Sequence, residues 1–440
     1  MRTLRAALFV LAIPLALAVP AAAVIGTIDH VPAATLLLPY FEVDLGDPAG
    51  MNTLFSVNNA SAGAILAHVV VWSDLSVPVL DFNLYLTGYD VQTVNLRDIL
   101  VNGVLPRTAS AGQDPGDTIS PKGQFSQDVN FASCTGLLPP PTPALPASFI
   151  QHLQRSLTGQ SSPVLGDFCA GRALGDNSAR GYVTVDTVSN CTLRFPGDPG
   201  YFAPGGSGDA TDQNALWGDF ILLDSTGIAG GDPLVHIEAS ATDPRTSTNG
   251  QYTFYGRYDS PAWSAADNRE PLPMKFASRY LNGGPFDGGT DLIVWRDSKV
   301  NQAPFPCPAA AGVRPPWFPL GQQAIVIFDE QEQPVVPTTF PVSPQPPGQG
   351  IVPFPAETQR VPVGGASLPV PFNFGWMFLD FDFMVANSPP SNPLAAQAWV
   401  LELMTGGGSS TSLVPGAKRN GKKFGILKHA VVVPDPVPPP

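Results

Sequence analysis

Short apolar runs, separated by Gly, Pro, Asn and Asp, predict many short β-strands and few helices along this chain. The run from Asp81 to Leu86 alternates polar and apolar residues, so we expect one of its faces to be buried and the other to be in water. Short strands with turn residues between them are typical of β-sandwiches and barrels. The predicted strands are 34–41, 53–58, 67–72, 80–86, 91–96, 181–188, 219–224, 234–239, 276–281, 291–296, 324–328, 358–363, 375–383 and 397–404.

One segment, 146–157, has the apolar spacing of a helix, and Ser148 is a candidate N-cap. It lies in a region from about 106 to 179 that is rich in Gly, Pro, Ser and Asp. We interpret this region as a loop-rich insertion in a β domain. The apolar positions that carry the helical spacing are Phe149, Ile150, Leu153 and Leu157.

Two series of predicted strands have the same pattern of strand and turn residues in the same order, which indicates an internal duplication. The alternative is that any two β-sandwiches share a strand and turn pattern. The predicted fold is all-β, with two tandem Ig-like or jelly-roll-like antiparallel β-sandwich domains and a disulfide-stapled insertion in the first. The parallel segments are 52–61 with 289–298, 68–79 with 324–335, and the strands that open at Gly181 and Gly375.

The predicted boundaries follow these two series. The insertion of about 106–179 falls inside the first domain. The predicted parts are a signal peptide over 1–23, a first β-sandwich domain over 24–245, an aromatic and charged junction over 246–272, a second β-sandwich domain over 273–408, and a basic, then Pro-rich C-terminal tail over 409–440.

The composition supports a β-rich chain with few long helices. Of 440 residues, 50 are Pro and 43 are Gly, and both types break helices. Charged residues make up 13%, about half the usual share. The hydrophobic share of 44% excludes a disordered acidic chain. The net charge of −13 disfavours binding to nucleic acid.

The N-terminus has the three parts of a secretory signal peptide. Arg2 and Arg5 form a basic start, residues 6–19 are apolar, and small residues lead up to Ala23. We expect cleavage near Ala23 and a secreted, periplasmic or cell-envelope protein. No later apolar run reaches the length that a transmembrane helix needs, so no transmembrane segment is predicted.

Four cysteines in an exported chain predict two disulfides. Three pairings are possible. We favour Cys169 with Cys191, which leaves Cys134 with Cys307, and the nearest competitor joins Cys134 to Cys169. No C-x-x-C pair is present, so a zinc site of cysteines is not indicated.

The densest aromatic and charged cluster lies between Tyr252 and Tyr280. Aromatic rings beside carboxylates and arginines are suited to carbohydrate contact. The alternative is a structural junction, in which Arg257, Arg269 and Arg279 neutralise nearby carboxylates between the two domains, and we favour it. For a binding role the candidate residues are Tyr255, Arg257, Tyr258, Trp263 and Arg269.

Two sets of acidic residues are weaker candidates for chemistry. A glycosidase needs a pair of carboxylates, and a Ca²⁺ site needs several oxygen ligands on a flexible loop. No cofactor is predicted, and Ca²⁺ is the one metal considered. The candidate catalytic residues are Glu238, Asp259 and Glu270, and the candidate Ca²⁺ ligands are Asp198, Asp209 and Asp212.

No catalytic motif for a hydrolase, a phosphate-binding loop or a dinucleotide-binding fold is present in the sequence. The sequence therefore favours an exported, non-catalytic β-sandwich protein, a binding or structural module whose partner is an extracellular protein or a glycan. The alternative is a secreted carbohydrate-binding or glycoside-active protein that uses the Tyr252 to Tyr280 cluster. The sequence predicts neither the partner nor the oligomeric state.

Overall fold

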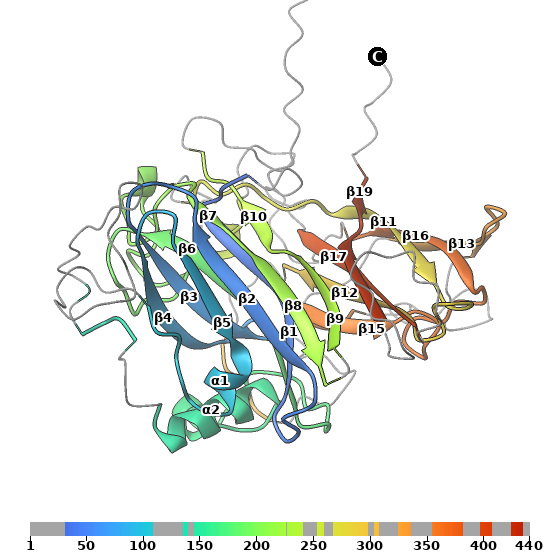
Figure 1. The fold of residues 1–440 in the computed structure, drawn as a ribbon, viewed down its shortest axis with the longest axis horizontal. Helices are drawn as coiled ribbons and strands as arrows, with labels where there is room; N and C mark the ends of the chain where they lie inside the picture. Colours follow the sequence, from blue (N-terminus) through green and yellow to red (C-terminus); the bar gives the residue numbers. More distant parts are fainter. Residues whose placement is uncertain are drawn as a thin grey trace, which may run out of the picture.

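The protein has a nearly all-β architecture of four antiparallel sheets (Figure 1). Its structure is a computed structural model. No helix of the described residues is long and apolar enough to cross a membrane. The described residues are 31–108, 134, 136–139, 145–225, 227–240, 253–258, 267–297, 303–307, 324–335, 354–381, 397–406 and 424–433.

The first two sheets form a first unit, residues 35–237, in which β1 of sheet 1 lies against β2 of sheet 2. In spatial order, sheet 1 contains β10 (Val235–Ile237), β1 (Thr35–Asp44), β6 (Ser178–Val188), β3 (Ile65–Ser73) and β4 (Pro78–Leu86). Sheet 2 contains β5 (Val91–Asn95), β2 (Asn52–Asn59), β8 (Asp219–Asp224) and β9 (Gly227–Pro233), and β7 (Leu216–Trp217) also pairs with β2.

The other two sheets form a second unit, residues 275–432. In spatial order, sheet 3 contains β19 (Val431–Val432), β11 (Lys275–Leu281), β16 (Phe374–Asp380), β13 (Ala324–Phe328) and β14 (Pro334–Val335). Sheet 4 contains β15 (Thr358–Pro362), β12 (Gly289–Arg296), β17 (Ala398–Gly406) and β18 (Phe424–His429).

Strand order is the same in the two units. Sheet 1 runs β10-β1-β6-β3-β4 and sheet 3 runs β19-β11-β16-β13-β14, while sheet 2 runs β5-β2-β8-β9 and sheet 4 runs β15-β12-β17-β18. Each strand of the second unit therefore has a counterpart in the first, in the same order along the chain. Strands β7 and β8 pair with successive parts of β2 in one register, and together they match the single strand β17.

The hairpin turn after β3 has the same hydrogen bonds as the turn after β13. The Ser73 hydroxyl accepts bonds from the amides of Leu75 and Val77, at 3.3 and 3.1 Å. In the second unit, the Asp329 carboxylate accepts from the amides of Gln331 and Gln333, at 2.9 and 2.8 Å. The next-to-last turn residue has a positive φ of 61° in both turns, at Ser76 and Glu332. These bonds fix the same register in both hairpins.

Two short helices and several single turns belong to the first unit. The predicted helix is present as α2 (Ala147–Leu157), but the expected Ser148 cap is wrong, because the N-cap is Pro146 and no side chain caps the helix. The five-residue helix α1 (Leu96–Leu100) was not predicted from the sequence, and Asn95 caps it. Single 3₁₀ turns are Pro163–Leu165, Pro204–Gly206 and, between the units, Gly256–Tyr258.

Both faces of β4 are buried, so the expectation that one face of Asp81–Leu86 is in water is wrong. Phe82 and Leu84 belong to the main core, as expected. Asn83 and Tyr85 on the opposite face are covered by the insertion and by the loop after β6. The Asn83 amide donates to the carbonyl oxygens of Thr192 and Leu137, at 2.9 and 3.3 Å.

The two units pack so that sheet 1 and sheet 4 lie face to face in the middle of the molecule. Strands β1 and β6 contact β12 and β15. At the rim of this contact, Arg360 of β15 lies 2.6 Å from Asp291 of β12 and 3.5 Å from Glu42 of β1. The layers therefore follow the order sheet 2, sheet 1, sheet 4, sheet 3, with β9 of sheet 2 beside β18 of sheet 4.

The described part of the predicted tail over 409–440 contains two strands. Strand β18 pairs with β17, and β19 pairs with β11. Lys428 of β18 lies 3.0 Å from the Glu402 carboxylate, so one of the basic residues there is held in an ion pair. Sheets 3 and 4 therefore extend beyond residue 408.

Candidate functional site

The described part of the aromatic and charged cluster crosses the outer face of sheet 1, between the two units. Residues 253–258 and 267–270 connect β10 to β11. They are held together by a bond from the amide of Phe254 to the carbonyl of Arg269, at 3.2 Å, and Arg269 also bridges to Ala239. Their side chains form two buried groups of charges.

The first group is centred on Asp186 of β6. One oxygen of its carboxylate accepts the Thr35 hydroxyl at 2.5 Å, and the other accepts the hydroxyls of Tyr201 and Tyr255, at 2.7 and 3.0 Å. The Arg269 guanidinium lies 3.5 Å from Asp186 and 3.3 Å from Asp267. Asp186 thus receives three hydroxyl bonds and one cation while it is fully buried.

Burial and charge shift the pKa values of this group in directions that keep both tyrosines protonated and the arginine charged. Burial, and then the Asp186 charge, raise the pKa of Tyr201 and Tyr255 well above the usual value, so both hydroxyls stay protonated donors. Burial alone would lower the pKa of Arg269, but Asp186 and Asp267 raise it overall. The guanidinium is therefore charged at every physiological pH.

The second group joins the two units through Arg257. Its guanidinium donates to Glu357, just before β15, at 2.5 Å, and lies 3.5 Å from Asp297, just after β12. The Tyr182 hydroxyl of β6 lies 3.4 Å from Glu357 and 2.7 Å from the Ser76 hydroxyl. Both partners of this ion pair are buried. Removal of one partner would leave an uncompensated buried charge and lower the stability of the fold strongly.

Stacked rings surround this second group. Trp72 and Tyr182 are cross-strand neighbours with ring centroids 5.7 Å apart and planes 6° from parallel. Trp295 of β12 meets Tyr182 edge-on at 5.9 Å and stacks on Phe254 at 5.5 Å. The contact between the units is thus aromatic, with buried charges at its centre.

The candidate carbohydrate residues are mostly inaccessible in this arrangement. Tyr255, Arg257 and Arg269 are buried and Tyr258 is half-buried. Trp263 lies outside the described residues. A sugar ring cannot stack on a tyrosine whose faces are already covered by protein, so these side chains act in the junction between the units.

The candidate catalytic carboxylates do not form an open pair among the described residues. Glu270 is buried and Glu238 is half-buried, and the two are joined by a backbone bond from the Glu270 amide to the Glu238 carbonyl at 2.9 Å. Asp259 lies outside the described residues.

The three candidate Ca²⁺ ligands bind protein donors. Asp198 accepts the amide of Phe195 at 2.8 Å, and Asp212 accepts the Asn268 side chain at 2.7 Å. Asp209 accepts the Thr192 hydroxyl at 2.7 Å and Arg194 at 2.9 Å. Across the residues that the structure describes, no group of three or more His, Cys, Asp or Glu side chains could hold a metal ion.

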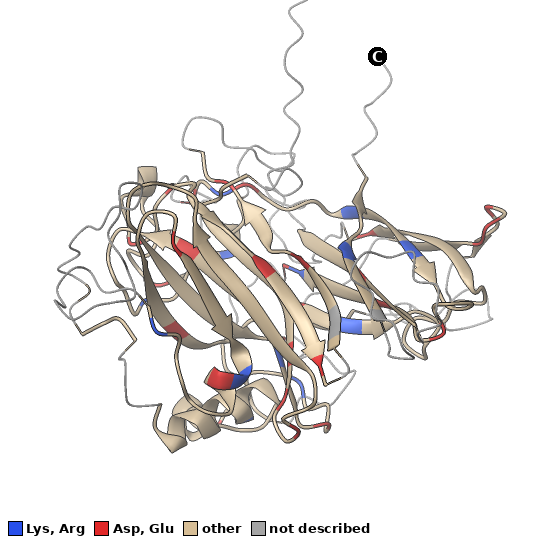
Figure 2. Cartoon of the chain, viewed as in Figure 1, with Lys and Arg blue, Asp and Glu red and all other residues tan. Residues whose placement is uncertain are grey.

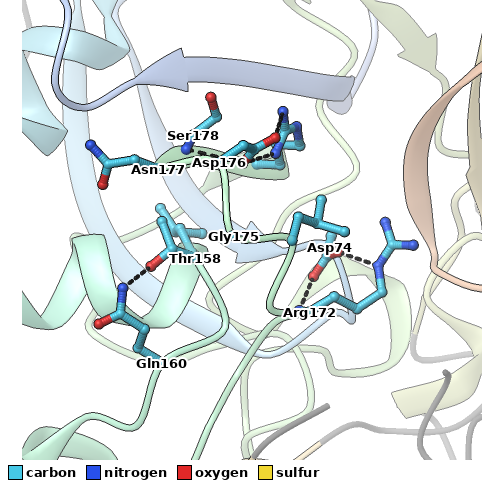
Figure 3. A pocket seen from close by; sticks show the side chains of 11 residues that line it. Asp74, Thr158, Gln160, Arg172, Gly175, Asp176, Asn177 and Ser178 are labelled. Carbon is cyan, nitrogen blue, oxygen red and sulfur yellow. Dashed lines mark hydrogen bonds and ion pairs between the residues drawn. The ribbon is translucent and has the colours of Figure 1, made fainter. Parts of the chain in front are cut away.

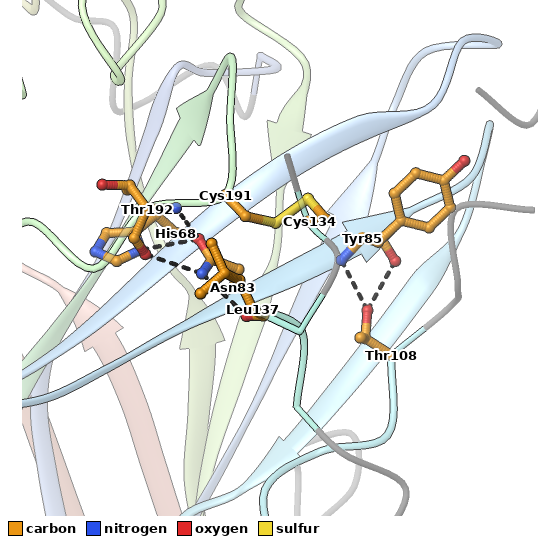
Figure 4. Close-up of a disulfide and its surroundings, with 8 residues drawn as sticks. All are labelled: His68, Asn83, Tyr85, Thr108, Cys134, Leu137, Cys191 and Thr192. Atoms are coloured by element: carbon orange, nitrogen blue, oxygen red, sulfur yellow. Dashed lines mark hydrogen bonds between the residues drawn. A yellow bond between two sulfur atoms is a disulfide. The ribbon is translucent and has the colours of Figure 1, made fainter. Parts of the chain in front are cut away.

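All four cysteines are in disulfides, as predicted, but the pairing is the third possible one, neither the favoured pairing nor its nearest competitor. Cys134 is bonded to Cys191, and Cys169 to Cys307. The favoured Cys169 to Cys191 pair and the competing Cys134 to Cys169 pair are both wrong. The first bond fastens the insertion to the loop after β6, beside Asn83 (Figure 4). The second fastens the insertion to the second unit.

Cys169 reaches the second unit because residues 169 and 305 form a two-sided bridge. The Cys169 amide donates to the Phe305 carbonyl at 2.8 Å, and the Phe305 amide donates back at 3.0 Å. This pairing of distant segments leaves no pattern in the sequence, so the sequence could not indicate Cys307 as the partner of Cys169.

One polar cleft of about 190 Å³ lies between α2 and the start of β6 (Figure 3). Two arginines line it, and each is paired with a carboxylate. Arg172 donates to Asp74 at 2.6 Å, and Arg180 donates to Asp176 at 2.7 Å. The cleft is therefore polar but has no net charge from these four residues.

Comparisons with protein families, with curated proteins and with solved structures found no match for this chain.

Proposed function

We propose that this is an exported, non-catalytic protein of the cell envelope or extracellular space, which acts as a binding or structural module. Export is supported by two disulfides, since such bonds persist in oxidising compartments. It is also supported by the signal-peptide pattern of residues 1–23, which lie outside the described residues.

The observation that carries the non-catalytic proposal is the burial of the charged cluster between the units. Arg257 and Arg269, the cations of the best candidate site, are occupied by Glu357, Asp297, Asp186 and Asp267. Arg257 joins the two units and Arg269 anchors the linking segment on sheet 1, so neither cation is free to face a substrate.

The test is a hydrolysis screen on a panel of glycans with the purified protein and with Glu270→Gln. We expect no turnover from either. Turnover that is lost in Glu270→Gln would overturn the proposal and favour a glycoside-active protein. A glycan array is the second arm: binding that is lost on Trp263→Ala would favour a carbohydrate-binding protein.

We further propose that the two units are tandem copies of one sandwich domain, Ig-like or jelly-roll-like. Support comes from the shared strand order and from the repeated turn after β3 and β13. A second repeated contact adds to it: Thr53 of β2 bonds both backbone groups of Glu42 at 3.0 Å, and Thr290 of β12 bonds those of Leu281 at 2.8 and 3.0 Å.

A further inference from the structure

The contact between the two units includes one sheet face from each, in addition to the edge contact of β9 with β18, and each face has a counterpart at an end of the molecule. The outer face of sheet 1 packs on the outer face of sheet 4. Their counterparts in strand order are the outer face of sheet 3 and the outer face of sheet 2. These two counterparts are the outermost layers of the structure.

Cross-strand residue pairs show which positions on the open faces match which positions on the buried faces. Trp72 pairs with Tyr182 in sheet 1, and Phe328 pairs with Trp376 at the matching place in sheet 3. Both are stacked, and the Phe328 and Trp376 centroids lie 4.1 Å apart. Yet Tyr182 is 1% exposed, whereas Trp376 is 38% exposed.

The same relation holds between sheet 4 and sheet 2. Trp295 pairs with Trp399 in sheet 4, and Asn58 pairs with Trp217 at the matching place in sheet 2. Trp399 is 3% exposed and packs against the rings of Phe276 and His429, whereas Trp217 is 42% exposed. An exposed indole is therefore found on each end face, at a place where the matching residue of the other unit is buried.

Apolar side chains adjoin each exposed indole, together with Arg279, which pairs with Trp376, and Asp219, which lies two residues from Trp217. On sheet 3, the half-exposed side chains of Val326, Phe328, Phe374 and Phe378 adjoin Trp376. On sheet 2, Val91 is exposed and Leu54, Ile221 and Leu223 are half-exposed on the face of Trp217. In Figure 2 the strands of sheet 2 carry few coloured segments. Large exposed apolar patches mark interaction sites.

We propose that the outer face of sheet 3 in one copy of this chain binds the outer face of sheet 2 in a second copy. This repeats between chains the contact that sheet 1 and sheet 4 make within the chain. The proposal rests on the proposed non-catalytic role and names the partner as a second copy. Because the two faces differ, the contact is heterologous, and repetition builds an open head-to-tail chain rather than a closed dimer.

Charge favours this partner over a like face. The outer face of sheet 2 carries Asp219, and its strands contain no Lys or Arg. The outer face of sheet 3 carries Lys275 and Arg279 beside Asp380. A contact of sheet 3 with sheet 3 would bring arginines together, whereas sheet 3 with sheet 2 brings Arg279 towards an acidic face.

The intermolecular contact is expected to be weaker than the one inside the chain. Within the chain, Arg257 and Arg269 come from the segment that links the units, and the disulfide from Cys169 to Cys307 holds them together. A second copy brings neither covalent link, so assembly depends on protein concentration.

The test is sedimentation velocity with light scattering, from about 1 μM to about 500 μM protein, the range that populates weak contacts. We expect the mass of the wild type to rise with concentration through the dimer to higher multiples. Trp217→Glu and Trp376→Glu each place a charge on one end face, and each variant is expected to stay monomeric. Leu193→Glu, at an exposed loop position away from both faces, is the matched control and is expected to assemble.

The decisive arm mixes the two variants in equal amounts. Each variant keeps one intact face, and the two intact faces complement each other, so the mixture is expected to form a dimer and nothing larger. Unchanged circular dichroism and thermal midpoints show that the variants are folded. A wild type that stays monomeric, a mixture that stays monomeric, or a dimer that survives either substitution would overturn head-to-tail assembly. None of these results touches the non-catalytic proposal, which the glycan screen tests.

Discussion

The first and second units share a strand order but differ in what covers their outer faces. In the first unit, the outer face of sheet 1 carries Asp186 and Tyr182, both buried by the linking segment and by the second unit. In the second unit, the matching positions of sheet 3 are Asp380, which is half-buried, and Trp376, which is exposed. The same backbone pattern therefore supports a buried polar face in one unit and an open face with exposed aromatic rings in the other.

This difference separates the residues that fix the strand register in both units from those that cover the outer face of sheet 1. The turn after β3 and the threonine of β2 are repeated in the second unit because they fix strand register, which both units need. The four hydrogen-bonded and ionic partners of Asp186 come from outside the repeated strands or from the edge of β1. They anchor the linking segment on sheet 1, and Arg257 of that segment reaches Glu357 of the second unit.

The largest effect is expected from loss of the disulfide that joins the units. Cys169 and Cys307 are 138 residues apart, and closing so long a loop in the unfolded chain is worth about 4 to 5 kcal/mol in the chain-entropy model. We expect Cys169→Ser with Cys307→Ser to lower the free energy of unfolding by about that amount, measured by denaturant titration.

The same titration tests whether the units act separately. Because sheet 1 and sheet 4 bury each other, we expect a single unfolding transition even without this bond. The matched control is Cys134→Ser with Cys191→Ser, which removes a bond inside the first unit. Two separate transitions in the first variant, but not in the control, would show that the contact between the units depends on the disulfide.

The next effect compares the matching aspartates. Asp186→Asn removes one of the two carboxylates beside Arg269, while Asp267 stays 3.3 Å away. It also weakens three buried hydrogen bonds to a charged group, so we expect a cost of about 1.5 to 3 kcal/mol. Asp380→Asn changes a half-buried residue on the open face of sheet 3 and is expected to cost less than about 1 kcal/mol. Denaturant titrations of both variants measure the difference, and equal losses would contradict the assignment of Asp186 to a buried contact.

Two glycines test how closely the units repeat each other. A Cβ at Gly181 would collide with the Trp72 carbonyl oxygen, and a Cβ at Gly375 would collide with that of Phe328 at the matching place. We expect alanine at either position to cost about 1 to 3 kcal/mol, because neither backbone can give way cheaply. Thermal unfolding measures both variants.

The control for these glycines is Gly63→Ala, where an added Cβ meets nothing within 4 Å. It is expected to be close to neutral. A large loss at Gly181 with none at Gly375 would show that the second unit tolerates a shift of β16 and that the repeat is looser there than the strand order indicates.

Much of the strand pattern could be predicted from the sequence, and the omissions have physical reasons. Strand β13, Ala324–Phe328, matches its predicted range because a short apolar run lies between clear turns. Strand β9, Gly227–Pro233, was missed because its glycines carry no apolar signal. Gly230 packs against Leu427 of β18, a place where a side chain would not fit.

The candidate site shows a different limit of sequence reasoning. The cluster between Tyr252 and Tyr280 was identified from composition alone, and the sequence favoured a junction over a sugar site. The sequence could pair Arg269 with Asp267, two residues away, but not with Asp186, because that contact depends on how the linking segment crosses sheet 1. The exposure of Trp217 and Trp376 likewise depends on which sheets face each other, and local patterns do not encode this.

The smallest effect is a pH dependence at the place where β9 meets β18. The His429 imidazole lies 3.6 Å from the Asp232 carboxylate, and Lys428, Glu402 and Trp399 are its other neighbours. The interaction with Asp232 raises the pKa of His429, although partial burial and Lys428 oppose this. A raised pKa in the folded state means that protonated His429 stabilises the fold below the unfolded pKa of about 6.5, and that this stability is lost as pH rises through the folded pKa.

We therefore expect His429→Gln to cost more at about pH 5.5 than at about pH 8.5, on either side of the usual histidine pKa. The His429 side chain is 35% exposed, so solvent screening keeps the difference below about 1 kcal/mol. Denaturant titrations at the two pH values measure it. In an Asp232→Asn background the pH dependence of the His429→Gln effect is expected to vanish, because the charge partner is gone. A cost that is the same at both pH values, or larger at high pH, would mean that the two units meet at β9 and β18 through packing alone.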